Sequence, residues 1–532
     1  MRFIFVILFG FLLFWAISPS PFPFGNQDPY LFWAVNKSCG GCLNNDLLAA
    51  QPDGFPLFTA LFQFFPIAWF PPLSHLLCLG GCCVYAYSLL SFLGFKKDEN
   101  DKSVYFSNLP NIALILLLHS GLLWGFFCKK FLGTDLNWLW HHGLAEQGLL
   151  FGYLQPSVSG VFLLLGLAFL YQERITAFIL AITLAGAFHA NYIVLGAMIF
   201  LAFIFFKPRL ALQHILWFVL PAIAWGIYGW YSLENFTPNS LEFITASRYF
   251  IQNNPHLDPL NWLNASSLFQ LLIMVSGIWT IRQTDFGKFL FLLFSLGVLL
   301  SVAALLSQNV FLVNLSPWRL SVVLMPLSLI LLVNRISQPQ FSTFLFSLGI
   351  VMLASAMFFK FFGNSSSDYL LKWRIGTAIL VLKAGIVLYF KPQKHLPSLL
   401  ILGILMGGVI QYCFEKLHIA NLPEAQAEAY IETLPNTNSL YLVPPDIRCF
   451  TLKTLAPAYL GNTVYFSPQL PLWKKHQEFE KAFFKNPAQF PISFIKSEKI
   501  THLLCSRQLM LPSSVWTLDI QLGQMNLYKR ND

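Results

Sequence analysis

The segment FGKFLFLLFSLGVLLSVAALL, residues 286–306, is apolar along its whole length except for Lys288 and two serines, Ser295 and Ser301. About twenty apolar residues in a helix are enough to cross the hydrocarbon core of a bilayer. Similar segments recur from residue 3 to residue 414, whereas residues 415–532 are far more polar. The pattern predicts a polytopic membrane domain, 1–414, followed by a soluble domain, 415–532, on one side of the membrane.

The composition supports this division. Hydrophobic residues make up 56% of the chain and charged residues 11%, whereas roughly a quarter of the residues in an average soluble domain are charged. The formal net charge is +9, but the basic residues are scattered through short loops rather than gathered in a patch. We therefore expect a membrane lipid as a partner and no nucleic acid.

The spacing of the apolar segments predicts about 13 spans. The four prolines at 56, 66, 71 and 72 indicate that 56–70 is a broken or surface-lying helix rather than a span. With the N-terminus inside, the short inner loops hold most of the Lys and Arg residues. An odd number of spans then places the tail outside. The predicted spans are 3–17, 73–93, 110–128, 149–171, 174–189, 190–206, 213–231, 266–281, 286–306, 318–334, 341–361, 371–390 and 397–414.

The outer face is then built from the long first loop, 18–72, from shorter loops at 129–148, 232–265 and 307–317, and from the tail. The tail is predicted to be a small α/β unit. Its expected helices are 424–434 and 473–484, and its expected strands are 439–443, 500–505, 516–521 and 525–528. The last two strands would form a hairpin through 522–524.

Acidic residues of the first outer loop are the first candidates for catalysis. Asp28 comes shortly after the first span, so its carboxylate would lie just above the lipid headgroups. A carboxylate there can take a proton from an acceptor or hold a divalent cation. The structural alternative is a turn residue, because Asp before Pro favours turns. Asp46 and Asp53 lie further along the same loop.

The second outer loop contains a possible metal pair. His142 and Glu146 are four positions apart, so they would share one face if this stretch were helical, and together could bind a divalent metal such as Mg or Mn. The alternative is an interfacial helix with ordinary polar residues. In the first loop, Cys39 and Cys42 predict either a local disulfide or two free thiols.

Basic and polar residues near the outer ends of spans are candidates for substrate binding. Arg319 opens a predicted span, where a guanidinium can bind a lipid phosphate through a forked pair of hydrogen bonds or can simply extend to the interface. Arg248 is a weaker candidate of the same kind. Gln155, His189 and Asn191 would either line a central cavity or cap helices.

Three short stretches, together with the layout, resemble a known family. They are GYLQPS at 152–157, FHANY at 188–192 and LVPPD at 442–446. The chain is similar to bacterial polytopic proteins related to the GT-C superfamily of membrane glycosyltransferases. The resemblance implies an all-α transmembrane bundle with a cytoplasmic N-terminus, a long acidic first outer loop and a small extracytoplasmic C-terminal α/β domain, in the bacterial inner membrane.

The resemblance also implies an activity. A polyprenyl-phosphate sugar would enter from the lipid and pass its sugar, with inversion, to an extracytoplasmic acceptor. The acidic residue after the first span maps to Asp28, and Arg319 would bind the phosphate. Many members carry an adjacent acidic pair, whereas Asp28 stands between Gln27 and Pro29, so Asp46 or Asp53 could be the base instead. The competing functions are a lipid or small-molecule transporter or flippase, and a non-catalytic membrane protein of the cell envelope.

Overall fold

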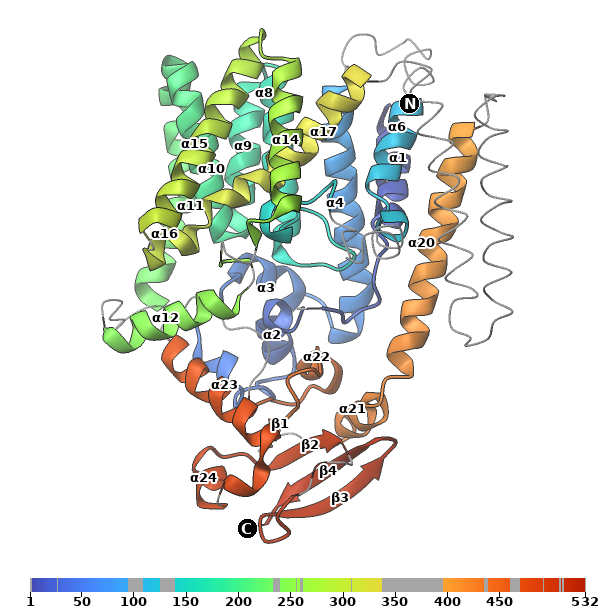
Figure 1. The fold of residues 1–532 in the computed structure, drawn as a ribbon, viewed down its shortest axis with the longest axis vertical. Helices are drawn as coiled ribbons and strands as arrows, with labels where there is room; N and C mark the ends of the chain where they lie inside the picture. The colour runs from blue at the N-terminus through green and yellow to red at the C-terminus, as the bar shows by residue number, and fades with distance from the viewer. Residues whose placement is uncertain are drawn as a thin grey trace.

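The structure is a computed structural model, in which helices form a bundle and a small sheet domain lies at one end (Figure 1). The predicted spans 341–361 and 371–390 lie outside the described residues. The described ranges are 2–25, 27–93, 109–124, 139–232, 240–254, 256–258, 262–307, 309–336, 396–434, 439–459, 469–490, 492–506, 509 and 511–531.

The bundle is made of long apolar helices. Within the described ranges, five stretches are long and apolar enough to cross a membrane, namely Ile67–Phe92, Pro208–Tyr228, Asp285–Ser307, Leu312–Arg335 and Pro397–Ala420, and five further apolar helices are shorter. These findings confirm the predicted helical membrane domain. The bundle helices are α1 (Arg2–Ala16), α4 (Phe70–Phe92), α6 (Leu109–Leu118), α8 (Val161–Tyr171), α9 (Ile175–Phe188), α10 (Ala190–Phe206), α11 (Pro208–Ser232), α14 (Ala265–Thr280), α15 (Asp285–Ser307), α16 (Val310–Leu315), α17 (Ser321–Ile336) and α20 (Leu396–Ala420).

One predicted span is misplaced at its start. The span expected at 149–171 begins as an α-helix only at Val161, after a 3-10 helix η4 (Pro156–Gly160). Gln155 has extended backbone angles, because the residue before a proline is disfavoured in the helical region. The stretch 149–155 is therefore a loop, and it reaches the end of the bundle where the first outer loop folds.

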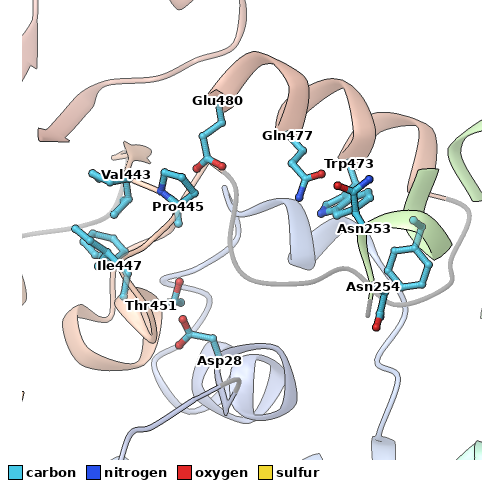
Figure 2. Close-up of a pocket in the computed structure, with 14 residues that line it drawn as sticks. Asp28, Asn253, Asn254, Val443, Pro445, Ile447, Thr451, Trp473, Gln477 and Glu480 are labelled. Atoms are coloured by element: carbon cyan, nitrogen blue, oxygen red, sulfur yellow. The ribbon is translucent and has the colours of Figure 1, made fainter. Parts of the chain in front are cut away.

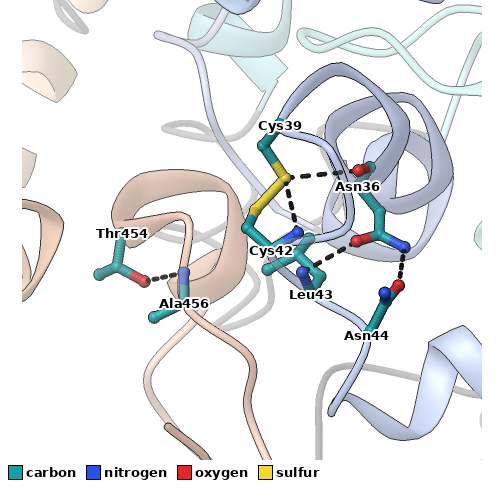
Figure 3. The surroundings of a disulfide bond; sticks show 7 residues. All are labelled: Asn36, Cys39, Cys42, Leu43, Asn44, Thr454 and Ala456. Carbon is teal, nitrogen blue, oxygen red and sulfur yellow. Dashed lines mark hydrogen bonds between the residues drawn. A yellow bond between two sulfur atoms is a disulfide. The ribbon is translucent and has the colours of Figure 1, made fainter. Parts of the chain in front are cut away.

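The first outer loop folds into short helices at this end of the bundle: α2 (Gln27–Ser38), η1 (Leu47–Ala50), α3 (Pro56–Gln63) and η2 (Ile67–Trp69). Eight residues give α3 a length of about 12 Å, too short to cross a membrane. A disulfide joins Cys39 to Cys42, the first of the two alternatives predicted for this pair. Figure 3 shows the bridge beside the tail residues Thr454 and Ala456, with Asn36 bonded to the Leu43 amide and to Asn44.

The tail contains a four-stranded sheet in the order β1-β2-β4-β3, from β1 (Tyr441–Leu442), β2 (His502–Ser506), β3 (Trp516–Leu522) and β4 (Met525–Arg530). The first pair is parallel and the others are antiparallel. The predicted β3–β4 hairpin is present, and its turn contains Gly523 at a positive φ of 56°. The helices of the tail are α21 (Ala425–Glu432), α22 (Phe450–Thr454), α23 (Leu470–Lys485), η6 (Pro487–Gln489) and α24 (Ile492–Ser497).

The tail packs directly on the first outer loop. It has two apolar clusters of its own around its sheet. Leu452, Leu470 and Trp473, however, are buried in the core of the membrane domain. Helix α12 (Leu241–Asn253) lies against α23 at the same end, and the N-terminus lies at the opposite end (Figure 1).

Candidate active site

The first turn of α2 is held in place by Gln27. Its side-chain carbonyl accepts the Phe24 amide at 2.8 Å, and its side-chain NH₂ donates to the Leu154 carbonyl at 3.0 Å. Gly25, just before the helix, has a φ of +64°, and a Cβ there would lie 2.7 Å from the Tyr153 ring. These contacts fix the N-terminal end of α2 against the loop at 149–155.

Asp28 is buried in this first turn and points toward the tail. Its Oδ1 accepts the Leu452 amide of α22 at 2.9 Å, and the residue is 3% exposed. The first amides of a helix have no partner within it, so Asp28 satisfies one such amide from a segment more than 400 positions away along the chain. Its carboxylate thus helps to hold the tail on the first loop.

Asp46 makes a second bond of this kind. Its Oδ1 accepts the Leu48 amide at 2.9 Å and its Oδ2 accepts the Ala458 amide at 3.0 Å. Burial raises the pKa of Asp46 to about 7, and the nearby charge of Asp28 adds to the rise, although the two amides oppose it. Because both oxygens bond backbone amides, the geometry favours a docking role for Asp46, and its role in catalysis stays a prediction.

A cavity of about 220 Å³ lies where α2, α12 and the tail meet. Figure 2 shows the Asp28 carboxylate below this space, with Gln477 and Glu480 directed into it from α23. Burial raises the pKa of Glu480 to about 8, and Lys481 opposes that shift. The remaining wall is formed by Phe250, Asn253, Asn254, Trp473 and parts of segment 443–458.

A second region, on the bundle side of α2, surrounds Arg319 in the 3-10 helix η5 (Pro317–Leu320). Arg319 interacts electrostatically with Tyr30, His189, Tyr192 and His256. Its Nε is buried without a hydrogen-bond partner among the described residues. Burial raises the pKa of the Tyr30 phenol, and the positive charge of Arg319 opposes that rise. A partly buried guanidinium among neutral rings is suited to binding an anion.

Tyr153 connects the two regions. It interacts electrostatically with Tyr30 on one side and with Arg448 and Cys449 of the tail on the other. Burial raises its pKa to about 12, so the phenol is neutral. Tyr153 therefore lies at the N-terminal end of α2, between the surroundings of Arg319 and the cavity.

Of the other predicted substrate-binding residues, His189 lies near Arg319, whereas Arg248 lies outside the described cavity wall. His189 lies beside Arg319, where its ring packs on Tyr192 and its Nδ1 accepts the Asn191 amide at 3.2 Å. Gln155 is buried in the loop before η4. Arg248 is exposed on α12 and is absent from the described cavity wall, so the structure does not bring it to the site.

The predicted His142–Glu146 pair does not lie on an α-helix. The stretch forms a 3-10 turn, η3 (Leu144–Glu146), with positive φ angles at Ala145 and Glu146. His142 Nδ1 faces the main-chain oxygen of Glu146 at 3.1 Å, and its Nε2 faces the Leu150 oxygen at 3.2 Å. The described part of the chain contains no group of three or more His, Cys, Asp or Glu able to hold a metal. A metal at this pair stays a prediction that the contacts do not support.

Sequence reasoning missed several residues of both regions. Glu480 and Gln477 belong to a charged amphipathic helix, a pattern typical of a solvated face. They line the cavity because α2, α12 and segment 443–458 pack around α23. His256 and Tyr30 carried no motif. Tyr153 was the exception, because it belongs to the GYLQPS stretch that carried the resemblance.

Comparisons with known proteins identify the fold. No family model matches the sequence, and no curated protein matches it. The crystal structure of ArnT from Cupriavidus metallidurans in the apo state is similar over 99% of this chain and 97% of that chain, with 12% identity and a TM-score of 0.53. A structure of the same ArnT bound to undecaprenyl phosphate covers the same shares, with 11% identity and a TM-score of 0.46. The chain has an ArnT-like GT-C fold.

Proposed function

We propose that this protein, whose fold is that of the GT-C glycosyltransferase ArnT, is a membrane glycosyltransferase that moves a sugar from a polyprenyl phosphate to an acceptor. One observation carries the proposal. The first turn of α2 places Asp28 at a cavity and Tyr30 within electrostatic range of the Arg319 guanidinium. A single helical turn thus joins a carboxylate that can accept a proton to a cation that can bind a phosphate.

The reaction follows from these two groups. Asp28 takes the proton of an acceptor hydroxyl, whose oxygen attacks the anomeric carbon of the donor sugar and forms the new glycosidic bond. The bond between that carbon and the phosphate oxygen breaks, and the electron pair leaves with the polyprenyl phosphate. Arg319 stabilises the charge that develops on the phosphate. Attack opposite the leaving group inverts the anomeric centre, and no metal is needed for any of these steps.

The sidedness of the protein is also part of this proposal. The N-terminus and the tail lie at opposite ends of the bundle (Figure 1), and the short loops at the N-terminal side are the more basic. We place the N-terminus in the cytoplasm of a bacterium and the tail outside its inner membrane. The division into 1–414 and 415–532 is retained, although helix α20 continues to Ala420.

The test compares two substitutions of one residue. Asp28→Asn keeps an oxygen that can accept the Leu452 amide but removes the base, whereas Asp28→Ala removes both. We expect Asp28→Asn to lower sugar transfer from polyprenyl-phosphate donors by about 10²- to 10⁴-fold, with protease resistance of the tail unchanged. Asp28→Ala should lose transfer and also expose the tail to protease. Normal transfer by Asp28→Asn would remove Asp28 from the chemistry.

A non-catalytic role is the second candidate. It is favoured by the bonds from Asp28 and Asp46 to tail amides, because carboxylates that hold two domains together need have no other role. In that case purified protein would transfer no sugar from any polyprenyl-phosphate donor, and Asp28→Asn would behave like the unmodified chain in every binding measurement.

A further inference from the structure

We infer that the cavity between α2, α12 and α23 is the acceptor subsite, and that it takes a sugar rich in hydrogen-bond donors rather than a phosphorylated one. The inference rests on the proposed function and deepens it, because it names the class of acceptor. Three properties of the cavity wall support it independently: its charge, its unfilled hydrogen-bonding capacity and its aromatic surface.

The charge of the wall is acidic. Asp28 and Glu480 are the ionisable side chains among the described residues that line the cavity, and no Lys, Arg or His is among them. This is unusual in a chain with a net charge of +9. Lys481 acts on Glu480 from the next position of α23, but it is exposed and extends to the Tyr249 hydroxyl. A phosphate in the cavity would face the Asp28 carboxylate, with no basic side chain of the described wall to offset the repulsion.

The wall also has a hydrogen-bond acceptor that is not used within the protein. Gln477 Oε1 is buried and has no hydrogen-bond partner among the described residues, and a buried acceptor without a partner is unfavourable. Glu480 is 3% exposed and is directed into the same space (Figure 2). A ligand carrying O–H or N–H groups can donate to Gln477 Oε1, whereas an anion without donors cannot.

The indole of Trp473 supplies an apolar surface. Its ring is held by edge contacts with Tyr249 and Phe250 of α12, at centroid distances of 6.0 and 5.6 Å. A small number of polar groups around an aromatic surface is the usual composition of a small-molecule site. The apolar face of a sugar ring can pack on the indole while its hydroxyl groups reach Gln477 and Glu480.

The protonation of Glu480 fits the same ligand class. Burial raises its pKa to about 8, so in the empty cavity at neutral pH the carboxyl group is largely protonated and can both donate and accept. A sugar hydroxyl group also donates and accepts, so it can pair with this carboxyl group in either direction. An amine on the sugar would instead favour the ionised carboxylate and form an ion pair.

Saturation-transfer NMR with the detergent-solubilised full chain tests the inference. The probes are glucose, glucosamine and glucose 6-phosphate, which share one ring and differ in charge. We expect glucose or glucosamine to bind and glucose 6-phosphate to bind at least tenfold more weakly. Salt distinguishes the two favoured probes, since it weakens an ion pair with an amine and leaves binding of a neutral sugar unchanged. Preference for the phosphorylated sugar, or no binding of any probe, would overturn the inference.

Matched variants of α23 assign the binding to this cavity. Glu480→Gln and Gln477→Leu should each weaken sugar binding about tenfold, and either one suffices if the other does not fold. Glu478→Gln is the control, because Glu478 lies on the same helix with its side chain 55% exposed and near Lys474. Equal binding by the Glu480→Gln, Gln477→Leu and Glu478→Gln variants would contradict the inference.

A parallel measurement separates this inference from the proposed function. The same preparations are examined by native mass spectrometry for binding of undecaprenyl phosphate. If the lipid binds and no sugar does, the acceptor subsite is wrong and the transferase proposal stands. If sugars bind as expected and the lipid does not, the cavity is a sugar site but the donor assignment is wrong.

Discussion

The two regions on either side of the first turn of α2 differ in charge and in the segments that build them. The region around Arg319 is cationic and is formed by helices of the bundle and the loops that join them, with neutral tyrosine and histidine rings around the guanidinium. The cavity at α23 has two acidic side chains and no basic one in its described wall, and it is formed where the tail packs on α2 and α12. In the function that we propose, this difference in charge separates a place for a phosphate from a place for a hydroxyl-bearing sugar.

Replacing Arg319 tests the cationic region and should have the largest effect. We expect Arg319→Ala to lower sugar transfer by about 10²- to 10³-fold, since it removes the charge that stabilises the leaving phosphate. Arg319→Lys keeps the charge but loses the forked geometry, so it should retain part of the activity. Steady-state transfer assays on both variants measure this. Full activity of Arg319→Ala would show that the phosphate binds elsewhere.

Replacing Gly25 tests whether the two regions depend on one turn. Gly25→Ala introduces a Cβ 2.7 Å from the Tyr153 ring at a positive φ, which would displace the first turn of α2 from both regions. Gly40→Ala is the matched control, because Gly40 also has a positive φ but no atom within 4 Å of the added Cβ. In each variant, an alanine at a positive φ lowers the free energy of unfolding by about 1 kcal/mol.

In Gly25→Ala, overpacking against Tyr153 should lower the free energy of unfolding by about 1–3 kcal/mol more. This variant should also lose most of its sugar-transfer activity. Thermal unfolding of the two variants and the transfer assay measure the difference. If both alanine variants behaved alike, the contact between Gly25 and Tyr153 would not be what positions α2, and the two regions would not be coupled through it.

The smallest expected effect concerns pH and the docking of the tail. The pKa of Asp46 is raised to about 7 in the folded protein, above its ordinary value near 3.9 in an unfolded chain. Between these values the folded state binds more protons than the unfolded state, so stability falls as pH rises from about 4 to 7. Glu480, with its pKa raised to about 8, adds a fall in the same direction up to about pH 8.

The measurement is Tm across pH 5–8 for the unmodified chain, Asp46→Asn and Glu480→Gln. The decline of Tm with rising pH should be shallower in each variant, and Glu478→Gln should follow the unmodified chain. A decline that is identical in all four proteins would show that neither carboxyl group couples the tail to pH.

Much of the fold could be predicted from the sequence, because its signals are local. Apolar segments such as 286–306 predicted the membrane helices, and alternation around Gly523 predicted the β3–β4 hairpin, since length and periodicity are local properties of the chain. The boundary at 149–171 was wrong because Pro156 interrupts an apolar run that continues on both sides of it.

The site was harder to predict because it is made by contacts between distant segments. Asp28 was identified through the resemblance, but its bond to Leu452 joins residues more than 400 positions apart. Glu480 was missed, since it lines a cavity whose other walls come from α2, α12 and segment 443–458, all distant from it along the chain. The spacing of His142 and Glu146 suggested a helical face, whereas the backbone turns sharply between them with positive φ angles.

A structure of the full chain with undecaprenyl phosphate bound, determined by electron cryomicroscopy, tests the separation of the two regions most directly. We predict phosphate density within hydrogen-bonding distance of the Arg319 guanidinium, close to Tyr30. We predict no phosphate density in the cavity between α2, α12 and α23. Phosphate density in that cavity, beside Asp28 and Glu480, would contradict the account.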